Sequence, residues 1–364
     1  MMLAATIRKP LERRYGQSGY QHIQTALTAY AEEAAAHLVV LDDADDKTLK
    51  EMNLQPAATT DPGALLLSLR AVRRQLGDID SILLVGGDSI FPHWRMANPV
   101  ADRDVDPDET VLSDNPYGTN TEDLEEYLAP PVAVGRLTDF ARGSAEDFVK
   151  LINAATDARK ARTPRSRSAA VSSTDWADYS RQAAGPLPGP VDWHFSPGYL
   201  LDQGKRADTD REFLYFNLHA FKGESDWKGY DTVQERFVTA VIPDAFDRQY
   251  VSGSVVFAEN CYGAETAGRT PNNSCALRLV QQGAAFVGAT GLAFGSHLAP
   301  NFFLDDADAL ARSFWSEFTS GTDLGEALRR ARSDYRDDPN TPQTNPFKQK
   351  TLLQFILLGD PGWN

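Results

Sequence analysis

Short apolar runs alternate with amphipathic segments along almost the whole chain of 364 residues, and this alternation most constrains the fold. The run SILLVGGDSI at 81–90 is typical of a buried strand, whereas PGALLLSLRAVRRQL at 62–76 repeats its apolar residues at helical spacing. Parallel strands need long crossover connections, which are usually helices that cover the sheet. The sequence therefore predicts an α/β fold with a mostly parallel sheet flanked by helices.

A basic segment interrupts this alternation near the middle of the chain. It contains Pro164 and three arginines and has no apolar period, so we interpret 161–167 as a linker. The expected parts are an N-terminal α/β subdomain at 1–160 and a second subdomain at 168–364. The alternative reading of the linker is an exposed processing site. The expected strands are 37–43, 81–90, 129–137, 168–174, 213–219, 254–260, 283–290 and 351–360, and the expected helices are 20–36, 62–76, 144–160, 235–246, 273–283, 306–320 and 323–336.

Composition and charge exclude several classes of protein. The formal net charge of −15 argues against nucleic acid and against anionic membrane surfaces as partners. No apolar run is long enough to cross a membrane, and the N-terminal segment lacks the apolar stretch of a signal peptide. Two cysteines are too few for a disulfide framework and suit a reducing compartment. We therefore expect a cytoplasmic protein.

Two of the expected strands end in reactive side chains. In FLYFNLHAF at 213–221, His219 is the last residue of the expected strand 213–219, and in SVVFAENCYGA at 254–264, Cys261 directly follows the expected strand 254–260. Parallel strands place their carboxyl ends at one edge of a sheet, where open α/β folds bind ligands. Taken alone, each residue also fits a structural role, a buried thiol or a satisfied core or surface histidine. Together their matching positions predict a thiol nucleophile with an imidazole base.

The surrounding segments resemble a known family. NLHAF and ENCYG resemble the His-Gly and Gln-Ala-Cys-x-Gly segments of caspases. Five further segments, in order, resemble those of gingipain-type caspase-like peptidases: LLVGGDSIFP (83–92), SDNPY (113–117), VAVGRL (132–137), QGAAFVGATG (282–291) and LLGDPG (357–362). The resemblance covers about residues 35–362. It implies a caspase-like cysteine endopeptidase that acts on a protein or peptide substrate, with no cofactor and no metal. By analogy, a regulatory protein or activator is a further expected partner.

The resemblance also implies roles for individual residues. Cys261 is the nucleophile, His219 is the base, and the N–H groups of Ala220 and Cys261 form the oxyanion hole. Some relatives add an acidic residue that orients the imidazole, and Asp175 is the candidate here, with a helix cap or turn residue as the other reading. The family has Gly where this chain has Ala220. This departure supports an alternative function, a catalytically inactive caspase-like module that binds partners or signals.

Candidate substrate-binding residues lie beside these positions. Glu259 and Asn260 directly precede Cys261, and two acid–aromatic clusters, at 173–179 and 223–230, supply Trp176, Asp226 and Trp227. Acidic candidates outnumber basic ones, which favours cleavage after Lys or Arg.

Two loops complete the expectations. DRDVDPDE at 102–109 has alternating aspartates similar to a calcium loop, but Pro107 stands where that loop needs Gly, so we expect a solvated acidic loop. His297 follows the strand at 283–290 and is expected to approach the substrate cleft.

Overall fold

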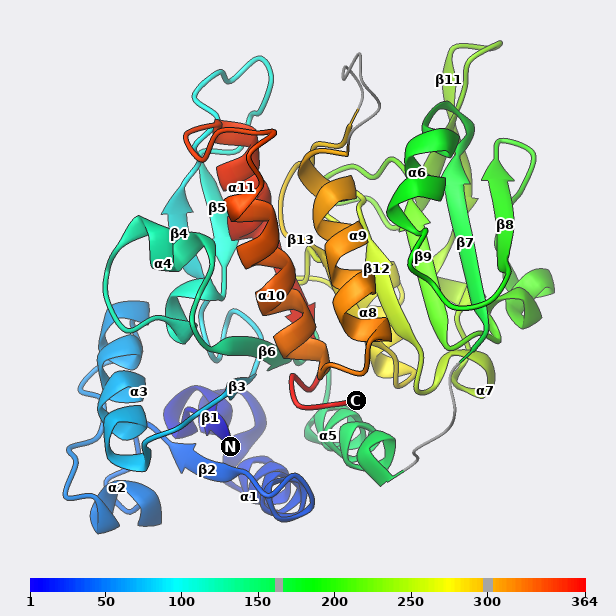
Figure 1. The fold of residues 1–364 in the computed structure, drawn as a ribbon. Helices are drawn as coiled ribbons and strands as arrows, with labels where there is room; N and C mark the ends of the chain where they lie inside the picture. The colour runs from blue at the N-terminus through cyan, green and yellow to red at the C-terminus, as the bar shows by residue number, and fades with distance from the viewer. Residues whose placement is uncertain (161–165, 297–303) are drawn as a thin grey trace.

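One ten-stranded sheet forms the centre of the molecule (Figure 1). The computed structural model describes residues 1–160, 166–296 and 304–364, so 161–165 of the expected linker and His297 lie outside the described residues. The order of strands across the sheet is β2-β1-β3-β6-β14-β13-β12-β9-β7-β8. These strands are β1 (Met2–Thr6), β2 (His37–Val40), β3 (Ser81–Val85), β6 (Ala133–Leu137), β7 (Ser168–Ser173), β8 (Val191–Ser196), β9 (Phe213–Asn217), β12 (Val255–Ala258), β13 (Ala285–Ala289) and β14 (Phe355–Leu358).

The sheet is mostly parallel, as the alternation predicts. Every pair of neighbouring strands in its described residues is parallel except β13 with β14. Strand β14 lies between β13 and β6, and Leu358 pairs with Arg136. The last strand thus joins strands from the first and second halves of the chain into one sheet. The division into two subdomains stays a prediction.

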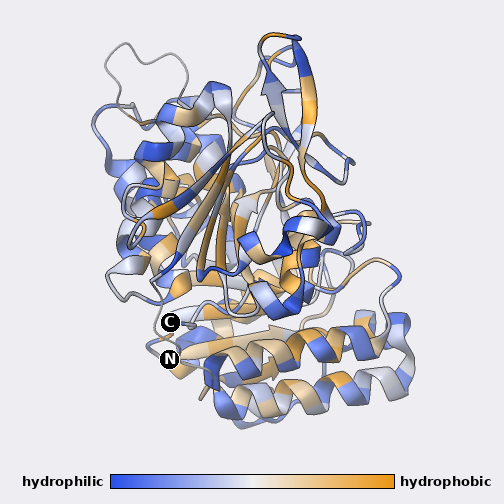
Figure 2. Ribbon diagram, turned by 90° about the vertical axis from the view of Figure 1, so that its right-hand side faces the viewer, coloured by the Kyte–Doolittle hydropathy of each residue, from blue (hydrophilic) through white to orange (hydrophobic). Residues whose placement is uncertain are grey.

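Helices cover both faces because successive strand residues point to opposite sides. In β9, Leu214 and Phe216 pack into the core shared with α1 (Arg8–Glu33), α5 (Ala145–Lys160) and α8 (Cys275–Gln281). Phe213 and Tyr215 pack on the other side with α6 (Ala177–Ala183), α9 (Asp306–Thr319) and α10 (Leu324–Asp337), and α3 (Pro62–Leu76) covers strands from the first half. Figure 2 shows apolar strands in orange between helices whose outer sides are blue.

Two hairpins and several short helices lie outside the large sheet. The hairpins are β4 (Trp94–Ala97) with β5 (Thr110–Ser113), and β10 (Trp227–Asp231) with β11 (Arg236–Val241). The second hairpin projects at the top of Figure 1. The short helices are α2 (Lys47–Glu51), α4 (Leu124–Leu128), α7 (Arg248–Val251), α11 (Pro346–Gln354) and the 3-10 turns η1 (Asn115–Gly118), η2 (Thr174–Trp176), η3 (Gln203–Thr209) and η4 (Pro243–Ala245).

Two expected elements are wrong. The helix expected at 235–246 is strand β11 followed by η4, since its alternating residues pair with β10 across a tight turn. The strand expected at 351–360 begins as helix α11, because Asn345 accepts hydrogen bonds from Phe347 and Lys348 and Pro346 suits a first helical turn. Only Phe355–Leu358 remain as strand β14.

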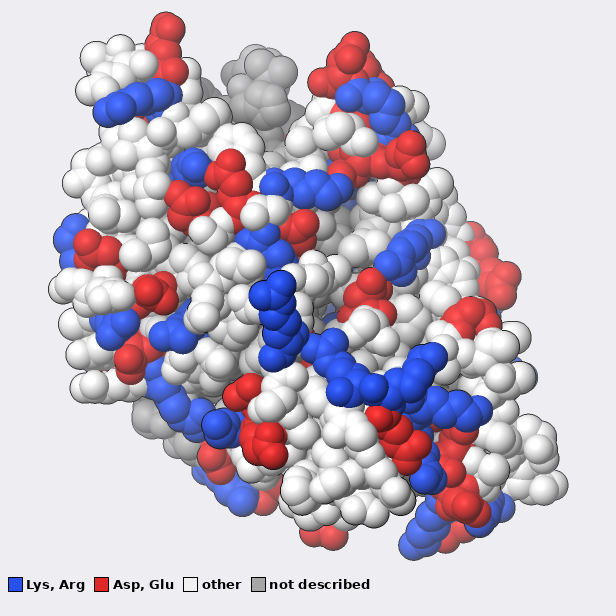
Figure 3. Space-filling model, turned by 180° about the vertical axis from the view of Figure 1, so that it is seen from behind, with Lys and Arg blue, Asp and Glu red and all other residues white. Residues whose placement is uncertain are grey.

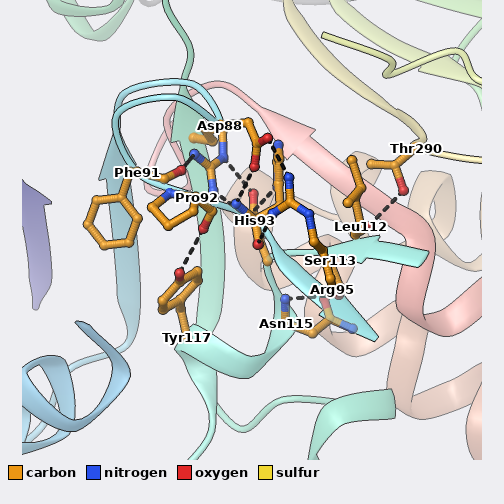
Figure 4. A network of polar contacts seen from close by, with 12 residues as sticks. Asp88, Phe91, Pro92, His93, Arg95, Leu112, Ser113, Asn115, Tyr117 and Thr290 are labelled. Carbon is orange, nitrogen blue, oxygen red and sulfur yellow. Dashed lines mark hydrogen bonds and ion pairs between the residues drawn. The ribbon is translucent and has the colours of Figure 1, made fainter. Parts of the chain in front are cut away.

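Three of the family-like segments meet in a buried polar network (Figure 4). Arg136 is fully buried and donates two hydrogen bonds to Asp114, at 2.9 and 2.5 Å. It also donates to the carbonyls of Gly86 and Phe91, and the His93 ring lies 2.8 Å from Asp114. Burial alone would raise the pKa of Asp114, but Arg136 and His93 outweigh it and hold this pKa far below its ordinary value. The network fixes the turns after β3 and β5.

The surface carries both signs of charge. Figure 3 shows basic side chains gathered in a band across the middle of the face opposite that of Figure 1, with acidic groups beside them. Among the described residues, no helix is long and apolar enough to cross a membrane.

Candidate active site

Three adjacent strands bring Asp175, His219 and Cys261 to one edge of the sheet. Strands β7, β9 and β12 are neighbours, and Phe216 of β9 pairs with Ala258 of β12. His219 and Cys261 lie at equivalent positions beyond this pair, and parallel strands are about 4.8 Å apart. Asp175 follows β7 at the same edge. The structure thus brings together three of the predicted site residues.

His219 is held in one orientation by its neighbours. Its Nε2 lies 3.5 Å from Oδ2 of Asp175, and its ring centroid lies 4.0 Å from that of Trp176. Its backbone exchanges hydrogen bonds of 2.8 and 2.7 Å with Lys228 of the hairpin. Burial opposes ionisation of Asp175, but hydrogen bonds from His219 and Ser173 outweigh it, so the pKa of Asp175 is lowered. Asp175 thus faces Nε2, and Nδ1 is the ring nitrogen on the other side.

Cys261 sits on a tight turn directly after β12. Tyr262 has a φ of 53°, and its N–H donates to the Gly291 carbonyl at 2.7 Å. The sulfur is partly exposed and lies 3.4 Å from both the nitrogen and the oxygen of Ala293. Burial raises the pKa of the Cys261 thiol, and the Ala293 amide opposes that rise only in part. The thiol is therefore protonated near neutral pH and needs a base to become a nucleophile.

Two backbone donors flank this position. Within the described part of the chain, the N–H groups of Ala220 and Cys261 donate no hydrogen bond to another residue. Ala220 is not among the non-glycine residues with positive φ, so its backbone conformation is one that any residue adopts. Alanine in place of glycine therefore introduces no strain at this point.

A pocket of about 230 Å³ opens beside the thiol. Its lining combines aromatic, small and acidic residues and contains no lysine or arginine among those described. The lining residues are Trp176, Tyr179, Asn217, Leu218, Glu259, Cys261, Ala293, Phe294, Gly295, Ser296, Ala307 and Asp308.

Two buried carboxyl groups line this pocket. Glu259 accepts a hydrogen bond of 2.5 Å from the Tyr215 hydroxyl, and Asp308 accepts hydrogen bonds from the Ser296 amide at 2.6 Å and from Asn217 at 3.4 Å. Burial first, and then the nearby Asp308 charge, raise the pKa of Glu259 well above its ordinary value. Burial and the neighbouring Asp308 therefore favour the protonated form of Glu259.

Three other predicted substrate-binding residues lie elsewhere. The Asn260 side chain accepts a hydrogen bond of 3.1 Å from the Leu218 amide and so ties the two strand ends together. Asp226 accepts a hydrogen bond of 2.6 Å from Thr239 and lies 3.7 Å from Lys228. Trp227 is only 4% exposed and packs in the core. None of the three lines the pocket, whereas Glu259 and Trp176 do.

The sequence analysis missed Asp308 and Ala293. Asp308 lies in the first turn of α9, where acidic residues are common, so its sequence position gave no sign of a pocket. Ala293 acts through its backbone, which no side-chain motif reveals. As for metals, the described residues contain no group of three or more His, Cys, Asp and Glu residues that could hold an ion.

Comparisons with known proteins identify the family and the fold. The model of Peptidase family C25 matches residues 37–364. A solved structure described as "Structure of Protease" aligns with 99% of this chain and 77% of its own, at 11% sequence identity and a TM-score of 0.56, which shows a shared fold. No curated protein sequence matches the chain.

Proposed function

Because the chain belongs to peptidase family C25, a family of gingipain-type cysteine peptidases with a caspase-like fold, we propose that it is an endopeptidase that uses a Cys261–His219 dyad. Family membership makes it a cysteine-type hydrolase. The observation that supports the dyad is the strand register, since His219 and Cys261 each lie three residues beyond the paired Phe216 and Ala258 of neighbouring strands. The partly exposed thiol beside a pocket supports the same assignment.

The reaction follows from the positions of these groups. Nδ1 of His219 takes the thiol proton as Sγ of Cys261 attacks the peptide carbonyl carbon. The resulting oxyanion accepts hydrogen bonds from the N–H groups of Ala220 and Cys261. The imidazolium, stabilised by Asp175, gives its proton to the leaving amine, and a thioester remains. Water then attacks the thioester with His219 as base, which releases the acid and the free thiol.

The alternative function, an inactive caspase-like binding module, rests on Ala220. The unstrained backbone of Ala220 and the unengaged N–H groups remove this reason to expect inactivity. We therefore propose the peptidase rather than the inactive module.

We propose that the enzyme cleaves after Lys or Arg. The pocket beside Cys261 is lined by two buried carboxyl groups, Glu259 and Asp308, and by no lysine or arginine among the described residues. A lysine or arginine side chain that enters this pocket would place a cation near these carboxyl groups, favour their ionised form and gain a charge-assisted contact. An acidic substrate side chain would find no basic partner there, which leaves a buried charge unpaired.

Location and regulation remain predictions. Both cysteines are free thiols, which is consistent with a reducing compartment such as the cytoplasm. A regulatory protein or activator stays a prediction from the family resemblance.

Cleavage of a peptide library tests the proposal. We expect wild-type protein to cut after Lys or Arg, and we expect Cys261→Ala and His219→Ala to abolish cleavage. Cys275→Ala is the matched control, because Cys275 is a buried core thiol far from the pocket lining, and it should retain activity. Cleavage by Cys261→Ala would refute the nucleophile, and cutting after Asp or Glu would refute the specificity.

A further inference from the structure

Two of the four aspartates in the acidic loop at 102–109 are buried. Asp106 is 0% and Asp108 is 8% exposed, whereas Asp102 and Asp104 are exposed. The expectation of a solvated loop is therefore wrong for these two residues. The loop connects β4 to β5 and rises at the top of Figure 1, at the edge of the sheet where the predicted site lies.

A buried ion pair anchors this loop. Lys350 of α11 and Asp106 are both fully buried and in direct contact. Asp106 also accepts hydrogen bonds from the Asn98 amide group at 2.9 Å and from the Asp108 N–H at 3.1 Å. Because a buried charge without its partner is costly, these contacts fix the position of the loop and of Asp108.

From this position, Asp108 touches the loops that surround Cys261. Its Oδ1 accepts a hydrogen bond of 2.9 Å from Lys222, in the segment that follows His219. Its Oδ2 accepts a longer hydrogen bond of 3.4 Å from the N–H of Leu292. The Lys222 ammonium that pairs with Asp108 lies 5.7 Å from the ring centroid of Tyr262, the residue that follows Cys261.

A short series of contacts connects Asp108 with the sulfur of Cys261. Leu292 precedes Ala293, whose nitrogen and oxygen both lie 3.4 Å from Sγ of Cys261. Gly291 accepts the Tyr262 hydrogen bond, and a Cβ at Gly291 would lie only 3.2 Å from Oδ2 of Asp108. The Asp108 carboxylate thus packs against the loop at 291–293, and Ala293 of this loop contacts Sγ of Cys261.

We propose that Asp108 is a positioning residue that joins the His219 loop, the Cys261 turn and the Leu292 loop into one rigid unit. Among the described residues, the hydrogen bonds of its carboxylate go to Lys222 and Leu292 rather than to the thiol or the imidazole, so it acts through these two residues. Burial opposes its ionisation, but Lys222 outweighs burial and lowers the pKa of Asp108, so the anchor is charged near neutral pH. The inference rests on the proposed function, since it assigns Asp108 a part in the dyad's reaction.

The test compares Asp108→Asn with Asp104→Asn in the full chain. Asp104 is an exposed residue of the same loop and serves as the matched control. We expect Asp108→Asn to lower kcat per folded molecule by about tenfold to a hundredfold with little change in KM, because small misplacements of catalytic groups have effects of this size. Asp104→Asn should match the wild type. Lys222→Gln changes a largely exposed side chain, so it should not affect folding. It should lower kcat as well. The double variant Asp108→Asn with Lys222→Gln should show no further loss of kcat, because both changes remove the same contact.

Hydrogen exchange gives a readout that needs no substrate. We expect amides in 290–296 to exchange faster in Asp108→Asn than in Asp104→Asn, with global stability measured in parallel. Wild-type kcat in folded Asp108→Asn and Lys222→Gln, or unchanged exchange in 290–296, would overturn the inference. Absence of cleavage by the wild-type protein would instead refute the proposed function, and the exchange experiment would still decide whether Asp108 holds the loop.

Discussion

Replacing Asp175 by Asn removes the charge that faces the imidazole of His219. The two side chains are 3.5 Å apart, a distance at which unit charges attract by about 5 kcal/mol at an effective dielectric constant of about 20. Their side chains are 21% and 25% exposed, so water screens a good part of this attraction. We take about 2 kcal/mol as the loss of transition-state stabilisation when the imidazolium forms, which corresponds to a roughly 30-fold fall in kcat.

The assay measures kcat and KM with a peptide substrate over about pH 5 to 8. KM should stay within about twofold, because Asp175 does not line the pocket. The control is Asp178→Asn, since the Asp178 side chain is 82% exposed in the neighbouring helix. The folded-state pKa of Asp175 lies below 3.8, so its contribution is present above that value and is lost only as the pH falls through the lowered pKa. A kcat above half of the wild-type value in Asp175→Asn would refute the reasoning.

Three further predictions concern neighbouring residues. Ala220→Gly should leave kcat within about twofold, because Ala220 has no positive φ, and a large gain would show that alanine impairs the oxyanion hole. Glu259→Gln should remove a pH dependence of stability. The folded-state pKa of Glu259 is raised above 4.5, so its contribution to wild-type stability is full below that value and declines as the pH rises. If the melting temperatures of both proteins changed with pH in the same way, this sign would be contradicted. Trp227→Ala should lower the free energy of unfolding by about 3–5 kcal/mol without changing the cleavage site, and altered specificity would place Trp227 in the pocket after all.

The sequence was sufficient for the elements that carry the predicted site. Strands β7, β9, β12 and β13 lie within the expected ranges because each is a short apolar run bounded by turn residues. Strand-end positions then predicted that His219 and Cys261 would meet at one edge, and their register in the sheet agrees.

The errors arose where partners distant in sequence decide the structure. β11 is a strand because β10 pairs with it, and its apolar spacing alone also fits a helix. Asp308 joins the pocket because α9 packs on the same face of the sheet as Tyr215, which donates a hydrogen bond to Glu259, so residues far apart in the chain meet there. Asp106 and Asp108 are buried because Lys350 and Lys222, respectively, pair with them from the second half of the chain. Sequence patterns report on local preference and carry little information about such contacts.

Covalent trapping tests the central claim most directly. The protein would be treated with a lysine-containing peptide that carries a thiol-reactive acyloxymethyl ketone, and the modified residue would be mapped by mass spectrometry. The account predicts one adduct on Cys261, formed much more slowly in His219→Ala, with Cys275 unmodified. Modification of Cys275 instead, or equal rates in the wild type and His219→Ala, would contradict the Cys261–His219 dyad.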